Sequence, residues 1–242
     1  SISKLSNYHF VTHETYKKRL IQLGEKKSSI FLVGSLGVQN FIETPKRSRI
    51  KLLNKYRIPQ NQKVVLVTFH PETNSKILIK KQINTLISAL KYFKDLYFIV
   101  TYNNMDSEGL YFIKKLKILE KKNKNFSLVK SLGSNLYFEL INIVDLVMGN
   151  SSSGIIEVPS TKTPTLNIGT RQSGRIMSKS IYSCKLEKLT IINSIKKILN
   201  KKKINTKNVY YKKNTREKIL NFLLKISKKQ NKNIKNFIDV KF

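Results

Sequence analysis

The chain has 242 residues, 40% of them hydrophobic, which is enough for one large domain or for one domain with part of another. No run approaches the roughly 18 apolar residues of a membrane span and no signal peptide opens the chain, so we expect no membrane partner. The single cysteine, Cys184, excludes an internal disulfide and favours a reducing compartment, so we expect a cytoplasmic protein.

The formal net charge of +33 comes mainly from lysine, and asparagine and isoleucine are abundant beside it. This combination is typical of an AT-rich coding sequence rather than of a surface selected to follow phosphates. The lysines are spread along the chain, without an arginine-rich arm or an aromatic RNA-binding motif. We therefore expect no specific nucleic-acid partner, although the charge favours non-specific binding of polyanions at low salt.

Two short strands with a helix between them are predicted at the start of the chain, over residues 8–11 and 30–33. Thr12 is the predicted N-cap of that helix. Gly34 and Gly37 then indicate a bend or linker.

From residue 63 onward, strands and helices alternate regularly. Strands are predicted at residues 64–69, 96–101, 126–129, 145–148 and 165–168. The first of them is almost continuously apolar, as expected for the buried centre of a parallel sheet. This alternation predicts an α/β fold with a Rossmann-like, doubly wound parallel sheet. Two amphipathic helices follow, near residues 186–199 and 215–226, and the segments beside them are rich in lysine and asparagine.

The most informative stretch is the turn after the fourth of these strands, which reads GNSSSG at residues 149–154. Backbone N–H groups and hydroxyls in such a turn, at the start of a predicted helix, suit a phosphate. A competing interpretation is a serine N-cap with Glu157 as its capping-box partner. Arg171 and Arg175, in the run GTRQSGR at residues 169–175, favour the phosphate, because a guanidinium offers oxyanions a fixed fork. We therefore predict a diphosphate site.

Polar or turn residues also follow the other strands. His70 follows the first strand, Asn104 the second and Leu132 the third, while Ser151 and Ser152 follow the fourth. Ligands of a doubly wound sheet bind beyond the carboxyl ends of its strands, so these residues are predicted to converge. Each alone could also serve only a helix cap or a turn. Together they indicate one site at one edge of the sheet.

Several runs of this sequence resemble the hydrolysing UDP-N-acetylglucosamine 2-epimerases of sialic acid and related nonulosonate biosynthesis. These runs are YHFVT (8–12), YKKR (16–19), VGSLG (33–37), TFHP (68–71), GNSSSGIIE (149–157) and GTRQSGR (169–175). The last two are specific, since non-hydrolysing relatives are expected to carry a different serine turn and Thr-Glu-Arg-Pro in place of Gly-Thr-Arg-Gln. The resemblance covers about residues 1–182.

The resemblance implies a GT-B architecture, in which two Rossmann-like domains enclose the active site. Residues 1–37 would be the end of the N-terminal domain with its linker, 38–200 the C-terminal UDP-binding domain, and 201–242 a Lys-rich tail with a C-terminal helix. With most of the first domain missing, the chain would be a fragment, one half of a split gene or a remnant. The partners implied are a UDP-sugar substrate, further copies of the full-length protein in a homo-oligomer, and a separate N-terminal half.

The resemblance also implies roles for individual residues. Those expected to contact the diphosphate are His70, Ser151, Ser152 and Arg171, with His70 as the catalytic residue of this half. Asn104 and the backbone of Leu132 would face the uridine. Glu157 would take the ribose hydroxyls, because a carboxylate accepts hydrogen bonds from two hydroxyls well.

The implied reaction is elimination of UDP, followed by addition of water with inversion at C2, which yields an N-acetylmannosamine-type sugar. Neither a cofactor nor a metal is expected, and His9 and His13 are interpreted as structural because they lack metal-ligand spacing. The acid and base carboxylates are expected in the missing domain. Two alternatives stay open: the same reaction on a UDP-diacetamido-trideoxy sugar, and a catalytically silent UDP-binding module. The run at residues 169–175 disfavours a GT-B glycosyltransferase.

Overall fold

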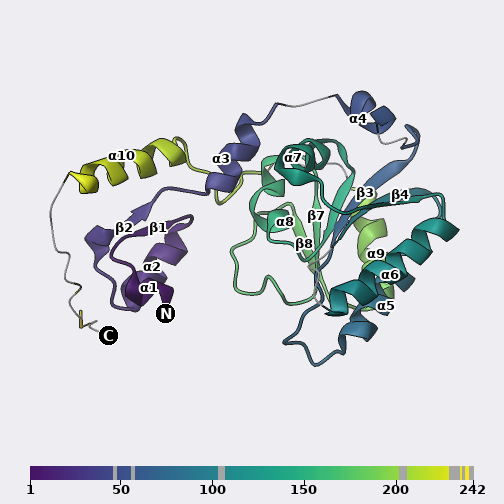
Figure 1. The fold of residues 1–242 in the computed structure, drawn as a ribbon, viewed down its shortest axis with the longest axis horizontal. Coiled ribbons are helices and arrows are strands. Elements are labelled where there is room, and N and C mark those ends of the chain that lie inside the picture. The colour runs from purple at the N-terminus through teal and green to yellow at the C-terminus, as the bar shows by residue number, and fades with distance from the viewer. Residues whose placement is uncertain are drawn as a thin grey trace. The chain divides into compact units, whose positions relative to one another are not determined.

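A computed structural model describes residues 1–45, 48–55, 58–102, 107–201, 206–228, 235 and 238–239. The chain forms two compact units, one of Ser1–Glu43 with Asn208–Phe242 and one of Thr44–Lys207. The resemblance implied a division at residues 37 and 200. The two units of the structure differ from it, because the last helix belongs to the unit that contains the first residues (Figure 1).

The smaller unit contains a two-stranded parallel sheet of β1 (His9–Val11) and β2 (Ile30–Leu32). Its helices are α1 (Ile2–Leu5), α2 (Glu14–Gln22), α3 (Leu36–Glu43) and α10 (Thr215–Ser227), with a 3-10 turn over Lys27–Ser29. Aromatic rings join α10 to the sheet, since the Phe222 ring centroid lies 4.2 Å from that of Phe31 and 5.5 Å from that of Phe10. This packing explains why the C-terminal helix belongs to this unit.

Both histidines of the smaller unit have structural roles, as predicted. His9 Nε2 lies 2.9 Å from the buried carboxylate of Glu25. His13 is the N-cap of α2, because its Nδ1 accepts a hydrogen bond from the Thr15 N–H at 3.1 Å. The prediction of Thr12 as the cap was wrong by one residue, since an imidazole nitrogen can accept this bond as a hydroxyl does.

The predicted linker after β2 is also corrected by the structure. Gly34 does turn the chain, with a φ of +92°. Gly37, however, lies inside α3, which begins at Leu36. The helix forms there because its buried face, which includes Val38 and Phe41, packs into the unit.

The larger unit contains a six-stranded parallel sheet in the order β5-β4-β3-β6-β7-β8. Its strands are β3 (Lys63–Thr68), β4 (Leu96–Thr101), β5 (Phe126–Val129), β6 (Leu146–Gly149), β7 (Thr165–Ile168) and β8 (Ile181–Cys184). Its helices are α4 (Arg49–Lys55), α5 (Ile79–Leu90), α6 (Ser107–Lys122), α7 (Gly133–Ile143), α8 (Ser153–Ile156) and α9 (Lys188–Leu199), with a 3-10 turn over Val158–Ser160. The edge strand β8 was not predicted, because it is half exposed and has no apolar run.

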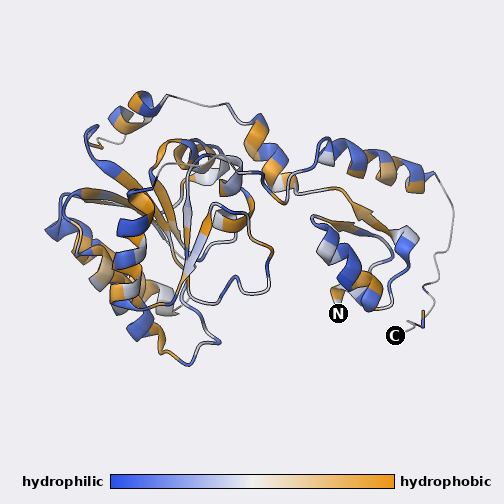
Figure 2. Ribbon diagram, turned by 180° about the vertical axis from the view of Figure 1, so that it is seen from behind, coloured by the Kyte–Doolittle hydropathy of each residue, from blue (hydrophilic) through white to orange (hydrophobic). Residues whose placement is uncertain are grey.

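Helices cover both faces of this sheet (Figure 1). On one face, strand side chains such as Val65 and Val67 pack with Leu86 of α5, Leu116 of α6 and Ile195 of α9 in one buried cluster. Helices α7 and α8 lie on the other face. The covering helices carry alternating hydrophilic and hydrophobic residues, as expected when one side of a helix is buried (Figure 2). The predicted α/β class with a Rossmann-like, doubly wound parallel sheet is confirmed.

Candidate functional site

The strand order reverses direction between β3 and β6, the two central neighbours of the sheet. In doubly wound sheets the crevice beyond the carboxyl ends of such strands is the usual ligand site. His70 follows β3 at this point, and the turn at residues 149–153 follows β6. The structure therefore brings these two sequence-predicted segments together.

Asn150 joins the two segments directly. Its side-chain Oδ1 accepts a hydrogen bond from the His70 backbone N–H, and its Nδ2 donates to the His70 carbonyl, both at 2.7 Å. The preceding residue, Gly149, has a φ of +129°, and a Cβ there would lie 1.9 Å from the Thr68 carbonyl oxygen. Only glycine therefore allows the end of β6 to approach the end of β3 this closely.

The loop after β7 completes the arrangement. The Arg171 guanidinium donates from Nη1 to the Asn150 carbonyl at 3.1 Å, and Gln172 Nε2 donates to the same oxygen at 2.8 Å. Glu72 Oε1 accepts the backbone N–H groups of Thr170 and Arg171, at 2.9 and 3.0 Å. The loops that follow β3, β6 and β7 are thus held together by hydrogen bonds.

The charged groups described at this junction are the Arg171 guanidinium and the Glu72 carboxylate. Within the described part of the chain, no carboxylate forms an ion pair with Arg171. His70 is half-buried, and its Nδ1 is buried without a hydrogen-bond partner among the described residues. Burial, together with the nearby charge of Arg171, lowers the pKa of His70. A neutral imidazole next to an unpaired guanidinium can donate hydrogen bonds to an anion.

The serine turn does not form the capping box that was the competing interpretation of this stretch. Ser152 is the N-cap of α8, but its side chain makes no capping hydrogen bond, and Glu157 follows the last residue of the helix. Helix α8 has only four residues, because Pro159 lies in the 3-10 turn that follows it. So few peptide dipoles add little charge at the N-terminus, and hydroxyls and backbone N–H groups remain the useful donors of this turn.

Glu157 lies in a half-buried polar cluster with Tyr137 and Ser153. Burial raises the pKa of its carboxyl group, against smaller lowering effects of the Ser153 hydroxyl and the Arg175 charge. Burial also raises the pKa of Tyr137 to about 12. Tyr137 Oη and Ser153 Oγ are both buried and lie close to each other, and the Ser153 hydroxyl also lies close to the Glu157 carboxyl group. The cluster offers a carboxylate and two hydroxyls to a polar ligand.

The two remaining predicted site residues are Leu132 and Asn104. Leu132 is half-buried and immediately precedes α7, whose first residue, Gly133, has a φ of +63°. No described contact joins Leu132 to His70 or Arg171. Asn104 lies outside the described residues.

Two residues that hold the site together were not predicted from the sequence. Asn150 was interpreted only as part of the serine turn, and Glu72 was not among the predicted site residues. The available signal was the position of Asn150 beside Ser151 and of Glu72 two residues after His70. Their hydrogen bonds cross between loops that are far apart along the chain, and the sequence alone does not reveal them.

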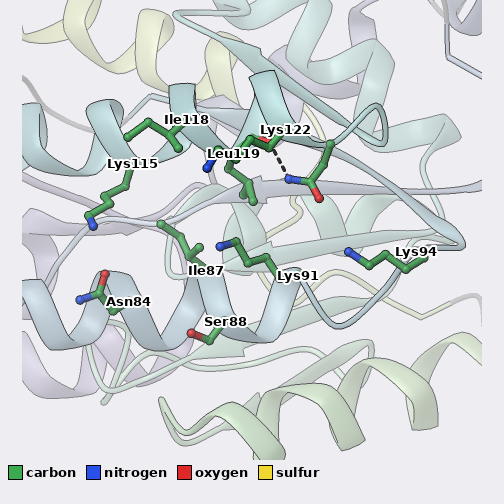
Figure 3. Close-up of a pocket in the computed structure, with 10 residues that line it drawn as sticks. Asn84, Ile87, Ser88, Lys91, Lys94, Lys115, Ile118, Leu119 and Lys122 are labelled. Atoms are coloured by element: carbon green, nitrogen blue, oxygen red, sulfur yellow. Dashed lines mark hydrogen bonds between the residues drawn. The ribbon is translucent and has the colours of Figure 1, made fainter.

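Of two other hollows in the larger unit, the first lies away from this junction and the second adjoins it. The first, of about 480 Å³, lies between α5 and α6, and no predicted site residue lines it (Figure 3). Its rim carries Lys91, Lys94, Lys115 and Lys122. The second, of about 440 Å³, adjoins the outer side of Glu72 and includes Cys184, whose pKa burial raises to about 11. That thiol is therefore a poor nucleophile near neutral pH.

Over the residues that the structure describes, no helix combines the length and apolar content needed to cross a bilayer. In the same residues, no three His, Cys, Asp or Glu side chains come together in a group that could hold a metal ion.

Solved structures with a similar fold include several epimerases. A Staphylococcus aureus MnaA structure with UDP superposes with a TM-score of 0.72 at 15% identity, over 93% of this chain and 61% of that one. The UDP-GlcNAc 2-epimerase of Neisseria meningitidis, bound to UDP-GlcNAc, gives a TM-score of 0.64 at 20% identity, over 92% and 62% of the two chains. At these identities the likeness concerns the fold, which in these neighbours is of the GT-B type.

Curated relatives are more similar in sequence to this chain than the solved structures above. The chain is 40% identical over 196 residues to polysialic acid biosynthesis protein P7 of Escherichia coli, which covers 81% of this chain and 50% of that protein. It is 39% identical over 193 residues to GDP/UDP-N,N'-diacetylbacillosamine 2-epimerase (hydrolyzing) of Campylobacter jejuni, over 78% and 50%. The chain thus spans about half the length of these curated relatives. The family model for UDP-N-acetylglucosamine 2-epimerase matches residues 1–224. As the resemblance predicted, the chain belongs to the UDP-N-acetylglucosamine 2-epimerase family.

Proposed function

We propose that this chain is the nucleotide-binding half of a hydrolysing UDP-sugar 2-epimerase. One observation carries the proposal: three loops meet at the switch point of the sheet and bring His70, the serine turn and Arg171 together. The unpaired guanidinium beside a half-buried histidine is suited to a diphosphate, which is the group that links uridine to the sugar.

Each predicted residue has a role in this proposal. The diphosphate is bound by Arg171, His70 and the hydroxyls of Ser151 and Ser152. Glu157 accepts the ribose hydroxyls from within its half-buried cluster. Asn104 and the backbone of Leu132 face the uracil base.

The chemistry assigned to this half is stabilisation of the leaving group. When UDP leaves C1 of the sugar, negative charge grows on the diphosphate, and a preorganised cation and hydrogen-bond donors lower the energy of that transition state. His70 is the catalytic residue in this sense, because it contacts the departing group. Proton transfer at C2 and activation of the water require acid and base groups. We assign those groups to the part of the protein that this chain does not include.

The substrate class proposed is a UDP-N-acetylhexosamine, with UDP-N-acetylglucosamine as the leading candidate. A UDP-diacetamido-trideoxy sugar is the second candidate, and the name of the Campylobacter jejuni relative supports it. The partners proposed are an N-terminal half, on the same or a separate chain, and further copies in a homo-oligomer. We propose a cytoplasmic location, which the single cysteine supports.

Binding of UDP to the isolated chain tests the proposal. With half a cleft we expect saturable binding with a Kd on the order of tens of micromolar to millimolar by calorimetry at moderate salt. Inorganic pyrophosphate is the matched control, since it carries the charge without the nucleoside. If pyrophosphate binds as well as UDP and roughly 0.5 M salt abolishes both, the affinity is diffuse charge and the proposal fails.

Turnover separates an enzyme from a silent binding module. The chain alone is expected to release no UDP from UDP-N-acetylglucosamine above the buffer rate. Addition of the N-terminal half of a curated relative is expected to restore release. Binding of UDP without any restored turnover would favour the silent module.

A further inference from the structure

Asn150 is the residue at which the three loops of the candidate site meet. Its side chain binds both backbone groups of His70, and its carbonyl oxygen accepts from Arg171 and Gln172. Its own N–H donates to the Thr68 carbonyl at 3.1 Å. Asn150 is only 1% exposed, so water does not compete for these bonds.

The amide side chain suits this position for a chemical reason. The His70 backbone presents one N–H donor and one carbonyl acceptor, and a primary amide carries the complementary oxygen and nitrogen side by side. A carboxylate would accept from the N–H but would face the carbonyl without a proton to donate. A serine hydroxyl is too short to bind both groups.

We infer that Asn150 is a positioning residue, which holds His70 and Arg171 at the separation that a diphosphate needs; this inference rests on the function proposed above. Asn150 need not contact the ligand to do so. It acts through the backbone of His70 and through the guanidinium of Arg171. A displacement of about 1 Å in such a site can cost a hundredfold in rate, so a fixed separation has a large effect.

The first test compares two asparagines that bind backbone groups at opposite ends of the same sheet. Asn125 donates from Nδ2 to the carbonyls of Phe93 and Leu96, at 3.1 and 2.9 Å, before the start of β5. Asn150→Ser and Asn125→Ser each remove such bonds without adding charge. We expect Asn150→Ser to weaken UDP binding about tenfold or more and Asn125→Ser to leave it within about twofold, although both lower stability. Equal UDP affinities for both variants and the wild type would overturn the inference.

The second test needs no ligand. The chain has three histidines, so NMR can follow each imidazole through a pH titration of the full chain. In Asn150→Ser the pKa of His70 is expected to rise toward its ordinary value, because the ring is no longer held in its half-buried position. His9 and His13 are expected to keep their signals, and Asn125→Ser is expected to change none of the three. An unchanged His70 titration in folded Asn150→Ser would contradict the inference.

These two readouts separate the inference from the proposed function. If the wild type fails to bind UDP but the His70 titration shifts as expected, the function is wrong and the positioning role stands. If the wild type and Asn150→Ser bind UDP equally, the positioning role is wrong and the function stands. Should Asn150→Ser not fold, Asn150→Gln keeps the uncharged amide but moves it outward by one methylene, and the same two results are expected of it.

Discussion

Strand β6 holds its neighbour β3 at both ends, with one polar residue at each end. At the amino end, Asp145 Oδ2 accepts from the Val64 N–H at 2.8 Å and from Arg49 Nη2 at 3.1 Å. At the carboxyl end, Asn150 binds the His70 backbone. The two connections look alike, but the charges around them differ.

The difference lies in how each arginine is neutralised. Arg49 forms an ion pair with Asp145 and also donates to the carbonyls of Ile143 and Gln62. Arg171 donates to the Asn150 carbonyl and has no carboxylate partner within the described ranges. Arg49 is therefore neutralised by an ion pair, whereas the Glu72 carboxylate at the carboxyl end binds backbone N–H groups and, among the described residues, forms no ion pair with the Arg171 guanidinium. The comparison indicates a structural role for the first connection and a ligand-binding role for the second.

We expect the largest effect on stability from a substitution of Gly149, where the end of β6 lies closest to the end of β3. Gly149→Ala places a Cβ against the Thr68 carbonyl in a backbone region that alanine avoids, so we expect a loss of at least about 3 kcal/mol in unfolding free energy. Denaturant unfolding measures it. Gly133→Ala is the control, since its φ is also positive but no atom lies within 4 Å, and about 1 kcal/mol is expected there. If the two variants lose similar amounts of unfolding free energy, the ends of β6 and β3 are not in close contact.

Removing the connection at the amino end should affect stability alone. Asp145→Ala leaves the Val64 N–H and Arg49 without their partner, and we expect a loss of about 2 kcal/mol in unfolding free energy. UDP affinity should stay within about twofold of the wild type when measured well below the unfolding transition. A parallel fall in UDP affinity would break the contrast between the two ends.

Exchanging each arginine for lysine compares the two ends directly. Arg171→Lys keeps the charge but loses the planar fork, so we expect UDP affinity to fall by roughly 1–3 kcal/mol, as measured by calorimetry. Arg49→Lys should lower the unfolding free energy and leave UDP affinity unchanged. If the two substitutions weaken UDP binding equally, the affinity comes from net charge and the diphosphate site does not exist.

The smallest effect concerns pH. The pKa of His70 lies below its ordinary value of 6.5 in the folded chain, so the unfolded chain binds the proton more readily as pH falls. Wild-type stability should therefore decrease more than that of His70→Asn between about pH 7.5 and pH 5. The difference will be small, because solvent screens the partly exposed ring. Unfolding curves at both pH values measure it, and parallel losses would show that the pKa of His70 is not lowered.

Much of the larger unit could be predicted because its signals are local. The apolar run that forms β3 depends on neighbouring residues, and this strand lies within one residue of its predicted bounds, 64–69. Two elements of the chain were predicted wrongly or not at all, also for local reasons. The half-exposed strand β8 carries little hydrophobic pattern, and His13 serves as an unusual cap.

The residues of the candidate site were predicted from their type and from their position after a strand, not from contacts between them. The rule that parallel strands end at one edge was enough to bring His70, the serine turn and Arg171 into one prediction. The same rule could not identify the connection through Asn150, because a turn asparagine usually bonds to its own loop. It also could not exclude the capping box, since that depends on where α8 ends.

The sequence by itself determined the α/β class, the alternation of elements and the family, since these depend on residue periodicity and on short runs whose spacing is local. Only the tertiary structure decided that α10 belongs with β1 and β2, and that Asn150 and Glu72 bind the loops after β3 and β7. The physical reason is that hydrogen bonds and ring contacts act over a few ångströms in space. Which distant residues come that close depends on the packing of the whole sheet and on the one glycine that lets β6 approach β3.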